Sequence, residues 1–301
     1  MTEQTAIDVT GEIRRMGNVF NLDVLKATYG LFTPLQERAP KDGVRIERDL
    51  AYGDHARHRL DVFTPERPPA ASAPVVVYIH GGGFVAGERS PVPGLIYDNV
   101  PTFFARHGMV GVNATYRLAP DHKWPSGAAD VGAVVGWLKD NVGRYGGDAD
   151  RIFLIGQSAG ATHAATYTFV EAVHGDGGPG IAGAILLSGS YAPLDPGFAT
   201  GAPGDNQIAY YGENLDSWAE RSPLNHVKPG HPPIFIGVAE FDHYPLMWPS
   251  AALLAALVKC DRTMPWFKQL RGHNHVSPAM HINSEIDILG PELLDFIASV
   301  D

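Results

Sequence analysis

The sequence has little of what disulfide-bonded, membrane-spanning or metal-binding proteins usually need. Its 301 residues include a single cysteine, Cys260, so no disulfide can form within the chain, and no Cys/His spacing resembles a zinc site. No run of about 18 uninterrupted apolar residues occurs, and the N-terminus lacks the cationic start and apolar run of a signal peptide. From these absences we predict a cytoplasmic protein without a bound metal or other cofactor.

Positive charge is also scarce. The 23 lysines and arginines are outnumbered by 33 aspartates and glutamates, which gives a net charge of −10 at pH 7. Because nucleic acids and acidic membranes attract proteins largely through lysine and arginine, we expect neither as a partner. The expected partner is a small molecule, and a homodimer is left open.

Short runs typical of β-strands alternate with helix-like stretches along most of the chain. This alternation predicts an α/β protein with a mixed, mostly parallel sheet of eight strands, flanked by helices. The first two strands are close enough in sequence to form an antiparallel hairpin. The predicted strands cover residues 44–52, 58–64, 74–80, 109–116, 151–155, 181–189, 233–239 and 264–270.

Helical spacing of apolar residues predicts helices over residues 128–142, 158–173 and 250–259, and Pro291 is expected in the first turn of the last helix.

Two segments fall outside the alternation and are candidates for covering a site, because long loops in compact domains are often functional. We predict that residues 1–43 form an N-terminal cap, with a helix over residues 21–31. Residues 191–227 are predicted to be a second cap segment. The main α/β domain would then span residues 44–301.

The sharpest motif is Gly156-Gln157-Ser158-Ala159-Gly160, directly between a predicted strand and a predicted helix. In such a strand-to-helix turn the two glycines relieve crowding, and the serine hydroxyl projects from the carboxyl edge of the sheet. Ser158 is therefore the predicted nucleophile.

A nucleophilic serine needs amide donors that stabilise the oxyanion. Three consecutive glycines in Tyr78-Ile79-His80-Gly81-Gly82-Gly83-Phe84 follow the third predicted strand. We predict that the N–H groups of Gly82, Gly83 and Ala159 form this oxyanion hole. His80 is predicted to stabilise the loop.

The acid and the base should follow later strands. Asp242 is the predicted acid, with Glu240 as its close alternative. His275 is the predicted base, favoured over His273 partly because of the family resemblance described next. The order serine, acid, base is that of the α/β-hydrolases.

Three ordered motifs resemble the hormone-sensitive-lipase-like esterases, the bacterial family IV carboxylesterases. They are the segment His80-Gly81-Gly82-Gly83-Phe84, the segment Tyr116-Arg117-Leu118-Ala119-Pro120 and the serine motif. Two positions depart from that family. Gln157 replaces the usual aspartate before the serine, and the acid loop, which usually includes D-P-L, is Asp242-His243-Tyr244-Pro245-Leu246.

Two further segments are similar to a feruloyl-esterase-like and kynurenine-formamidase-like branch. They are residues 146–154 and Gly272-His273-Asn274-His275-Val276-Ser277, and in this branch the base matches His275. The resemblance implies an α/β-hydrolase fold and cleavage of small to medium carboxylic esters through an acyl-enzyme. The alternatives are an amidase of the arylformamidase type and a non-enzymatic ligand-binding protein on a hydrolase scaffold.

Aromatic residues in loops near the carboxyl edge of the sheet are candidates for the substrate pocket, because such pockets are mostly apolar. Arg117 is predicted to be a structural ion-pair partner, and His163 and His174 are predicted to serve packing or surface roles. The candidate pocket residues are Phe84, Trp124, Tyr191, Tyr211, Tyr244 and Trp248.

Overall fold

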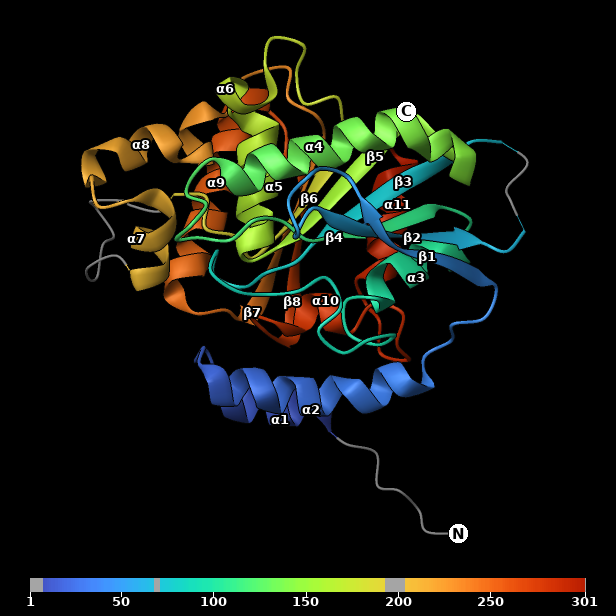
Figure 1. Ribbon diagram of the computed structural model, residues 1–301. Coiled ribbons are helices and arrows are strands. Elements are labelled where there is room, and N and C mark those ends of the chain that lie inside the picture. The colour runs from blue at the N-terminus through green and yellow to red at the C-terminus, as the bar shows by residue number, and fades with distance from the viewer. Residues whose placement is uncertain (1–7, 68–70, 193–203, 301) are drawn as a thin grey trace.

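One sheet of eight strands runs through the middle of the computed structural model, which describes residues 8–67, 71–192 and 204–300 (Figure 1). Its strand order is β1-β2-β4-β3-β5-β6-β7-β8. The strands are β1 Val44–Ala51, β2 Arg59–Pro65, β3 Ala73–Ile79, β4 Val110–Ala114, β5 Gly147–Gln157, β6 Gly183–Leu187, β7 Ile234–Phe241 and β8 Trp266–Asn274.

The predicted mixed sheet is confirmed. Strand β2 is antiparallel to both β1 and β4, and every pairing from β4 to β8 is parallel. The largest boundary differences are in β5, which begins four residues earlier than predicted, and in β8, which ends four residues later. The start of β5 is polar, so no apolar pattern marks it.

Helices cover both faces of the sheet and lie beyond its ends. They are α1 Val9–Met16, α2 Leu22–Arg38, α3 Asn99–Arg106, α4 Ser126–Asn141, η1 Val142–Tyr145, α5 Ala159–Phe169, α6 Glu171–His174, α7 Asp205–Tyr211, η2 Leu215–Ser217, α8 Trp218–Arg221, η3 Pro223–His226, α9 Tyr244–Asp261, α10 Ser277–Met280 and α11 Gly290–Ala298.

The alternation of side chains along each strand divides the core in two. In β3, Val75 and Val77 belong to the cluster packed under α4, α5 and α9, while Val76 and Tyr78 belong to the cluster packed under α3 and α11. Both sets are apolar because helices cover both faces of the sheet. The central strands are therefore buried on each side.

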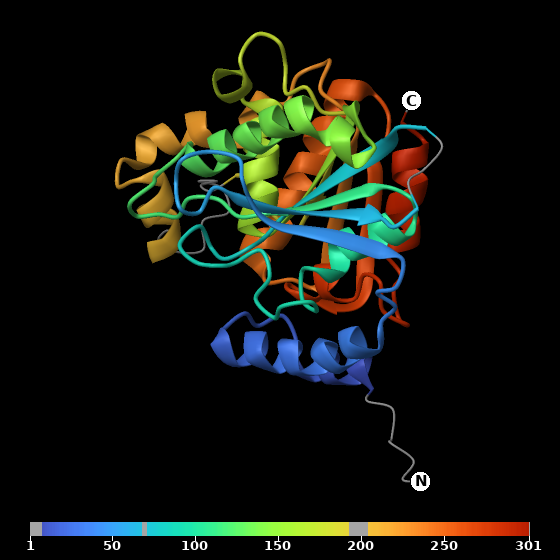
Figure 2. The same ribbon diagram turned by 45° about the vertical axis from the view of Figure 1, so that its right-hand side comes forward.

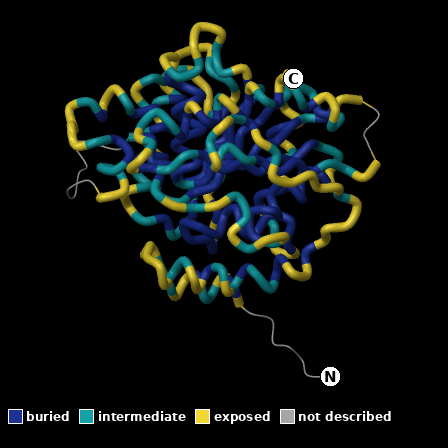
Figure 3. The backbone as a smooth tube through the Cα atoms, viewed as in Figure 1, coloured by how far each residue is buried: buried dark blue, intermediate teal, exposed yellow. Residues whose placement is uncertain are grey.

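Helices α1 and α2 form a separate layer outside the sheet, and their outer surface is exposed (Figures 1, 2 and 3). This layer is tied to the chain that follows β8. The buried side chain of Gln36 donates hydrogen bonds to the carbonyl oxygens of Met280 and Ile282, at 2.7 and 2.9 Å. Asn274 donates to the Thr28 hydroxyl at 2.8 Å. The N-terminal helices are thus anchored beside the end of β8.

Three helix predictions need correction. Helix α2 ends at Arg38, seven residues after the predicted end. Helix α9 begins at Tyr244, six residues before the predicted start, because Pro245 lies in its first turn, where a proline removes no intrahelical hydrogen bond. The predicted helix over residues 158–173 is interrupted at Val170, whose backbone is extended. His163 and His174 therefore lie on different helices.

The predicted second cap segment is described only in part. Residues 193–203 lie outside the described residues, and the remainder folds into α7, η2, α8 and η3. Within the described part of the chain, no helix combines the length and apolar character needed to cross a bilayer.

Candidate active site

Ser158 occupies a sharp turn between β5 and α5. Its backbone φ is +57°, a conformation that non-glycine residues rarely adopt. The flanking glycines permit this turn, since a Cβ at Gly160 would overlap the carbonyl oxygen of Ile79 and one at Gly156 would overlap the backbone of α5. The N–H of Ser158 donates to the carbonyl oxygen of Leu187 at 2.9 Å, which fixes the turn against β6.

The structure brings the three predicted catalytic side chains into one hydrogen-bonded chain. Nε2 of His275 lies 2.9 Å from the Ser158 hydroxyl oxygen, and Nδ1 lies 2.8 Å from a carboxylate oxygen of Asp242. Because a carboxylate only accepts, Nδ1 carries the proton and Nε2 is free to accept from the hydroxyl. This is the arrangement that activates a serine hydroxyl.

Asp242 is completely buried and held by three donors. Besides His275, its carboxylate accepts from the Ser188 hydroxyl at 2.5 Å and from the backbone N–H of Ala239 at 2.9 Å. Burial alone would raise the pKa of Asp242, but the hydrogen bonds and the charge of His275 outweigh burial and lower it. The carboxylate is therefore available to stabilise an imidazolium.

The two alternative residues face other partners. Glu240 accepts a hydrogen bond from the backbone N–H of Gly272 at 2.7 Å. Nδ1 of His273 lies 2.9 Å from the Ser277 hydroxyl, and its ring packs 4.1 Å from that of His281. Burial and the neighbouring His281 hold the pKa of His273 well below its usual value. Neither alternative contacts Ser158.

Two polar residues that support the site escaped the sequence analysis. Ser188 anchors Asp242, and Gln157 donates to the backbone carbonyl of His275 at 2.8 Å. Gln157 occupies the position at which the sequence departs from the family IV pattern. That departure was the only available signal; nothing in the sequence marks Ser188.

The glycine loop borders Ser158. Gly82 and Gly83 have φ values of +139° and +59°, and a Cβ at Gly82 would overlap the backbone of Ala86. His80 holds the base of the loop: its Nδ1 donates to the Gly81 carbonyl at 2.6 Å, and burial lowers its pKa to about 4. His80 thus has the loop-stabilising position expected from the sequence.

A cavity of about 980 Å³ opens above Ser158 and His275. Gly82, Gly83 and Ala159 lie in its wall. Three of the predicted pocket residues, Phe84, Tyr244 and Trp248, also line it. Helix α2 and the loop that precedes it close another side. Their lining residues are Phe20, Leu22, Leu25 and Tyr29.

The other three predicted pocket residues do not line this cavity. Tyr191 is fully buried in the core, where its hydroxyl accepts from the N–H of Gly189 at 3.1 Å. Tyr211 is fully buried against Trp218, with ring centroids 5.1 Å apart, and the Arg221 guanidinium lies over the ring of Trp124. These side chains pack behind the residues that line the cavity. Position in the sequence alone does not separate residues that line the cavity from residues that pack behind them.

Phe20 and His243 are further residues beside His275 that sequence analysis did not single out. The ring of Phe20 meets that of His275 edge-on at 4.9 Å and stacks on His243 at 5.5 Å. Burial, together with the neighbouring His275, lowers the pKa of His243 to about 4. The N-terminal segment thus reaches the proposed base directly.

Arg117 and His163 have the structural positions expected of them. Arg117 donates to the buried carboxylate of Asp130 through its backbone and its guanidinium, at 2.7 to 3.1 Å. His163 is buried among aromatic rings, with Nδ1 3.3 Å from the hydroxyl of Tyr210, and burial lowers its pKa to about 3.

Comparisons with known proteins point to esterases. The BD-FAE family model matches residues 60–176. Carboxylesterase NlhH of Mycobacterium tuberculosis is 34% identical over 198 residues, which cover 58% of this chain and 59% of NlhH. Esterase LipC of the same organism is 36% identical over 113 residues, 38% of this chain and 27% of LipC. The chain thus spans between about a quarter and three-fifths of these relatives.

Solved structures establish the fold. Esterase B from Lactobacillus rhamnosis superposes with a TM-score of 0.73 at 19% identity, covering 97% of this chain and 94% of its own. The chain therefore has the predicted α/β-hydrolase fold, and its sequence is similar to carboxylesterase NlhH and esterase LipC.

Proposed function

We propose that the chain is a serine hydrolase that cleaves carboxylic esters of small to medium size. The observation that carries the proposal is the hydrogen-bonded chain of Ser158, His275 and Asp242 at the floor of a cavity walled by Gly82 and Gly83. The similarity to NlhH and LipC supports the same reaction class.

In the proposed mechanism His275 removes the proton of Ser158 through Nε2 while the serine oxygen attacks the ester carbonyl. Asp242 holds the imidazole in the reactive tautomer and stabilises its charged form. The N–H groups of Gly82, Gly83 and Ala159 bind the developing oxyanion, and loss of one such donor costs about 3 kcal/mol of transition-state stabilisation.

The alcohol leaves with the proton that His275 returns. Water, deprotonated by the same histidine, then attacks the acyl-enzyme and releases the acid. The aromatic wall formed by Phe84, Tyr244 and Trp248 offers an apolar surface to the ester. We propose no metal or organic cofactor for these steps.

The test is hydrolysis of p-nitrophenyl esters of increasing acyl length, combined with labelling by a fluorophosphonate probe. Wild type should hydrolyse the shorter esters and be labelled, whereas Ser158→Ala should lose both properties. Ser217→Ala, which removes a serine outside the cavity, is the matched control. Absence of labelling in a folded wild-type protein would instead favour the ligand-binding alternative.

The amidase alternative shares the same three side chains, so substrates must separate the two activities. Turnover of N-formylkynurenine that exceeds turnover of p-nitrophenyl acetate would overturn the ester assignment. The cytoplasmic location stays a prediction, and the homodimer stays open. Sedimentation of the purified chain tests the homodimer.

A further inference from the structure

A second cluster of reactive side chains lies at the opposite ends of the strands. His231 precedes β7, and Cys260 and Asp261 end α9, just before β8. These are the amino-terminal ends of parallel strands, whereas Ser158 and His275 lie at carboxyl ends. None of the three lines the cavity above Ser158, so the cluster is separate from the proposed active site.

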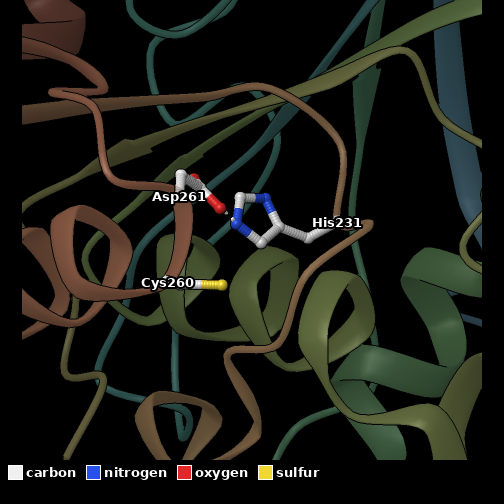
Figure 4. Close-up of side chains that lie close together, drawn as sticks. All are labelled: His231, Cys260 and Asp261. Atoms are coloured by element: carbon white, nitrogen blue, oxygen red, sulfur yellow. Dashed lines mark ion pairs between the residues drawn. The ribbon is translucent and has the colours of Figure 1, made fainter.

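The three side chains converge on one point. The ligand atoms that they offer, an imidazole nitrogen, a thiol sulfur and a carboxylate oxygen, all lie within 4.8 Å of one another. Figure 4 shows the His231 ring facing the Asp261 carboxylate, with the Cys260 sulfur directed to the same region. Nε2 of His231 is 3.2 Å from the carboxylate oxygen.

A hydrogen bond at Nδ1 fixes the orientation of the His231 ring. Its Nδ1 lies 2.8 Å from the backbone carbonyl of Pro232, and because a carbonyl only accepts, Nδ1 carries a proton. Nε2 is buried without a hydrogen bond, and only 9% of the side chain is exposed. In the neutral imidazole, the lone pair of Nε2 therefore faces the carboxylate of Asp261. Because both groups are acceptors, this contact is favourable only if a cation lies between them or if Nε2 carries a second proton.

We propose that His231, Cys260 and Asp261 bind a divalent transition-metal ion of the Zn²⁺ class. Zinc is held by nitrogen, sulfur and oxygen ligands of these types, and a hydrogen bond from the distal imidazole nitrogen to a carbonyl is its usual support. Three protein ligands leave a fourth position for water. On binding, the Cys260 thiol gives its proton to solvent, and the thiolate and carboxylate together neutralise the ion.

Such an ion would join the segment that enters β7 to the end of α9. No spacing motif marks the cluster, because His231 and Cys260 approach one another only in the folded chain. The rival arrangement is an ion pair between a doubly protonated His231 and Asp261, with Cys260 as a bystander. The two arrangements differ in whether the thiol becomes a thiolate ligand.

A Co²⁺ titration of the metal-free full-length protein distinguishes them. Since Cys260 is the only cysteine, a thiolate-to-Co²⁺ charge-transfer band in the near ultraviolet can come from this residue alone. We expect the band to saturate at one equivalent and to disappear when Zn²⁺ is added. Cys260→Ser should abolish the band, and His231→Gln should weaken Co²⁺ binding by about tenfold or more.

His226→Gln is the matched control, because it removes a histidine at the end of η3 whose Nε2 lies 2.7 Å from the carbonyl of Glu220, outside the cluster. It should leave the titration unchanged. Absence of the band in wild type, or a band with unchanged affinity in His231→Gln, would overturn the metal site. Ester hydrolysis by Cys260→Ser should equal that of wild type, which separates this test from that of the proposed active site.

Discussion

Two serine–histidine pairs have the same hydrogen-bond length, and their histidines lie near the end of β8 and directly after it. Ser158 and His275 are 2.9 Å apart, and so are Ser277 and His273. The first pair has the Asp242 carboxylate behind it and a cavity in front of it. The second is buried against the ring of His281 and does not line that cavity.

This contrast shows that a short serine–histidine distance does not make a nucleophile. The imidazole must also be held by an acceptor that stabilises its charged form, and the hydroxyl must face both substrate and amide donors. The buried pair satisfies its polar atoms within the protein and thereby stabilises the loop that carries His275.

Removing each serine should give the largest difference. Ser158→Ala should lower kcat/KM for p-nitrophenyl acetate by at least roughly a thousandfold, because the nucleophile is lost. Ser277→Ala should keep activity within a few fold but lower the free energy of unfolding by about 1 to 3 kcal/mol, because it leaves buried polar groups unpaired. Steady-state kinetics and urea denaturation measure the two effects, and a reversed pattern would refute the assignment.

Removing each histidine should give the same contrast in kcat/KM as removing each serine. His275→Ala should lower kcat/KM nearly as much as loss of Ser158, since the hydroxyl then has no base. His273→Ala should not lower it comparably. Circular dichroism of both variants establishes that they are folded. If His273→Ala were the inactive variant, the wrong imidazole would have been chosen as base.

Protonation of His273, in the buried pair with Ser277, should make the free energy of unfolding, rather than the activity, depend on pH. Because the pKa of folded His273 lies well below its usual value, the unfolded chain binds a proton first as pH falls below about 6.5. Stability should then fall by about 1.4 kcal/mol per pH unit for each such histidine. Urea denaturation between pH 7.5 and 5.5 should show a shallower slope for His273→Gln, and an identical slope would contradict this account.

The smallest effect concerns the cover over the active pair. Phe20→Ala removes the ring that packs edge-on against His275, a contact worth about 1 kcal/mol, and should change kcat/KM about fivefold. Val19→Ala is the control, because Val19 is half exposed and does not line the cavity. Equal kinetics for the two variants would mean that the N-terminal segment does not influence the reaction.

Local sequence patterns predicted the strands and the position of the nucleophile. Strand, glycine, serine and helix are consecutive at Ser158, so the turn is specified by neighbouring residues. Because these patterns depend only on neighbouring residues, they also explain which predictions were wrong. Tyr191 and Tyr211 follow the right elements, yet packing buries them in the interior, and Trp124 is half-buried against the cluster that contains Tyr211. Helix α9 continues through Pro245 and Pro249 because its first turn tolerates proline and the core supports the rest.

The sequence by itself determined the order of the sheet-forming and helical segments and the residue types available for acyl transfer, since these depend on short-range periodicity and turn chemistry. Only the tertiary structure decided that Asp242 rather than Glu240 meets His275, that Ser188 and Gln157 support the pair, and that His231 approaches Cys260. Hydrogen bonds depend on ångström-scale placement of residues distant in the chain, and that placement follows from packing of the whole core.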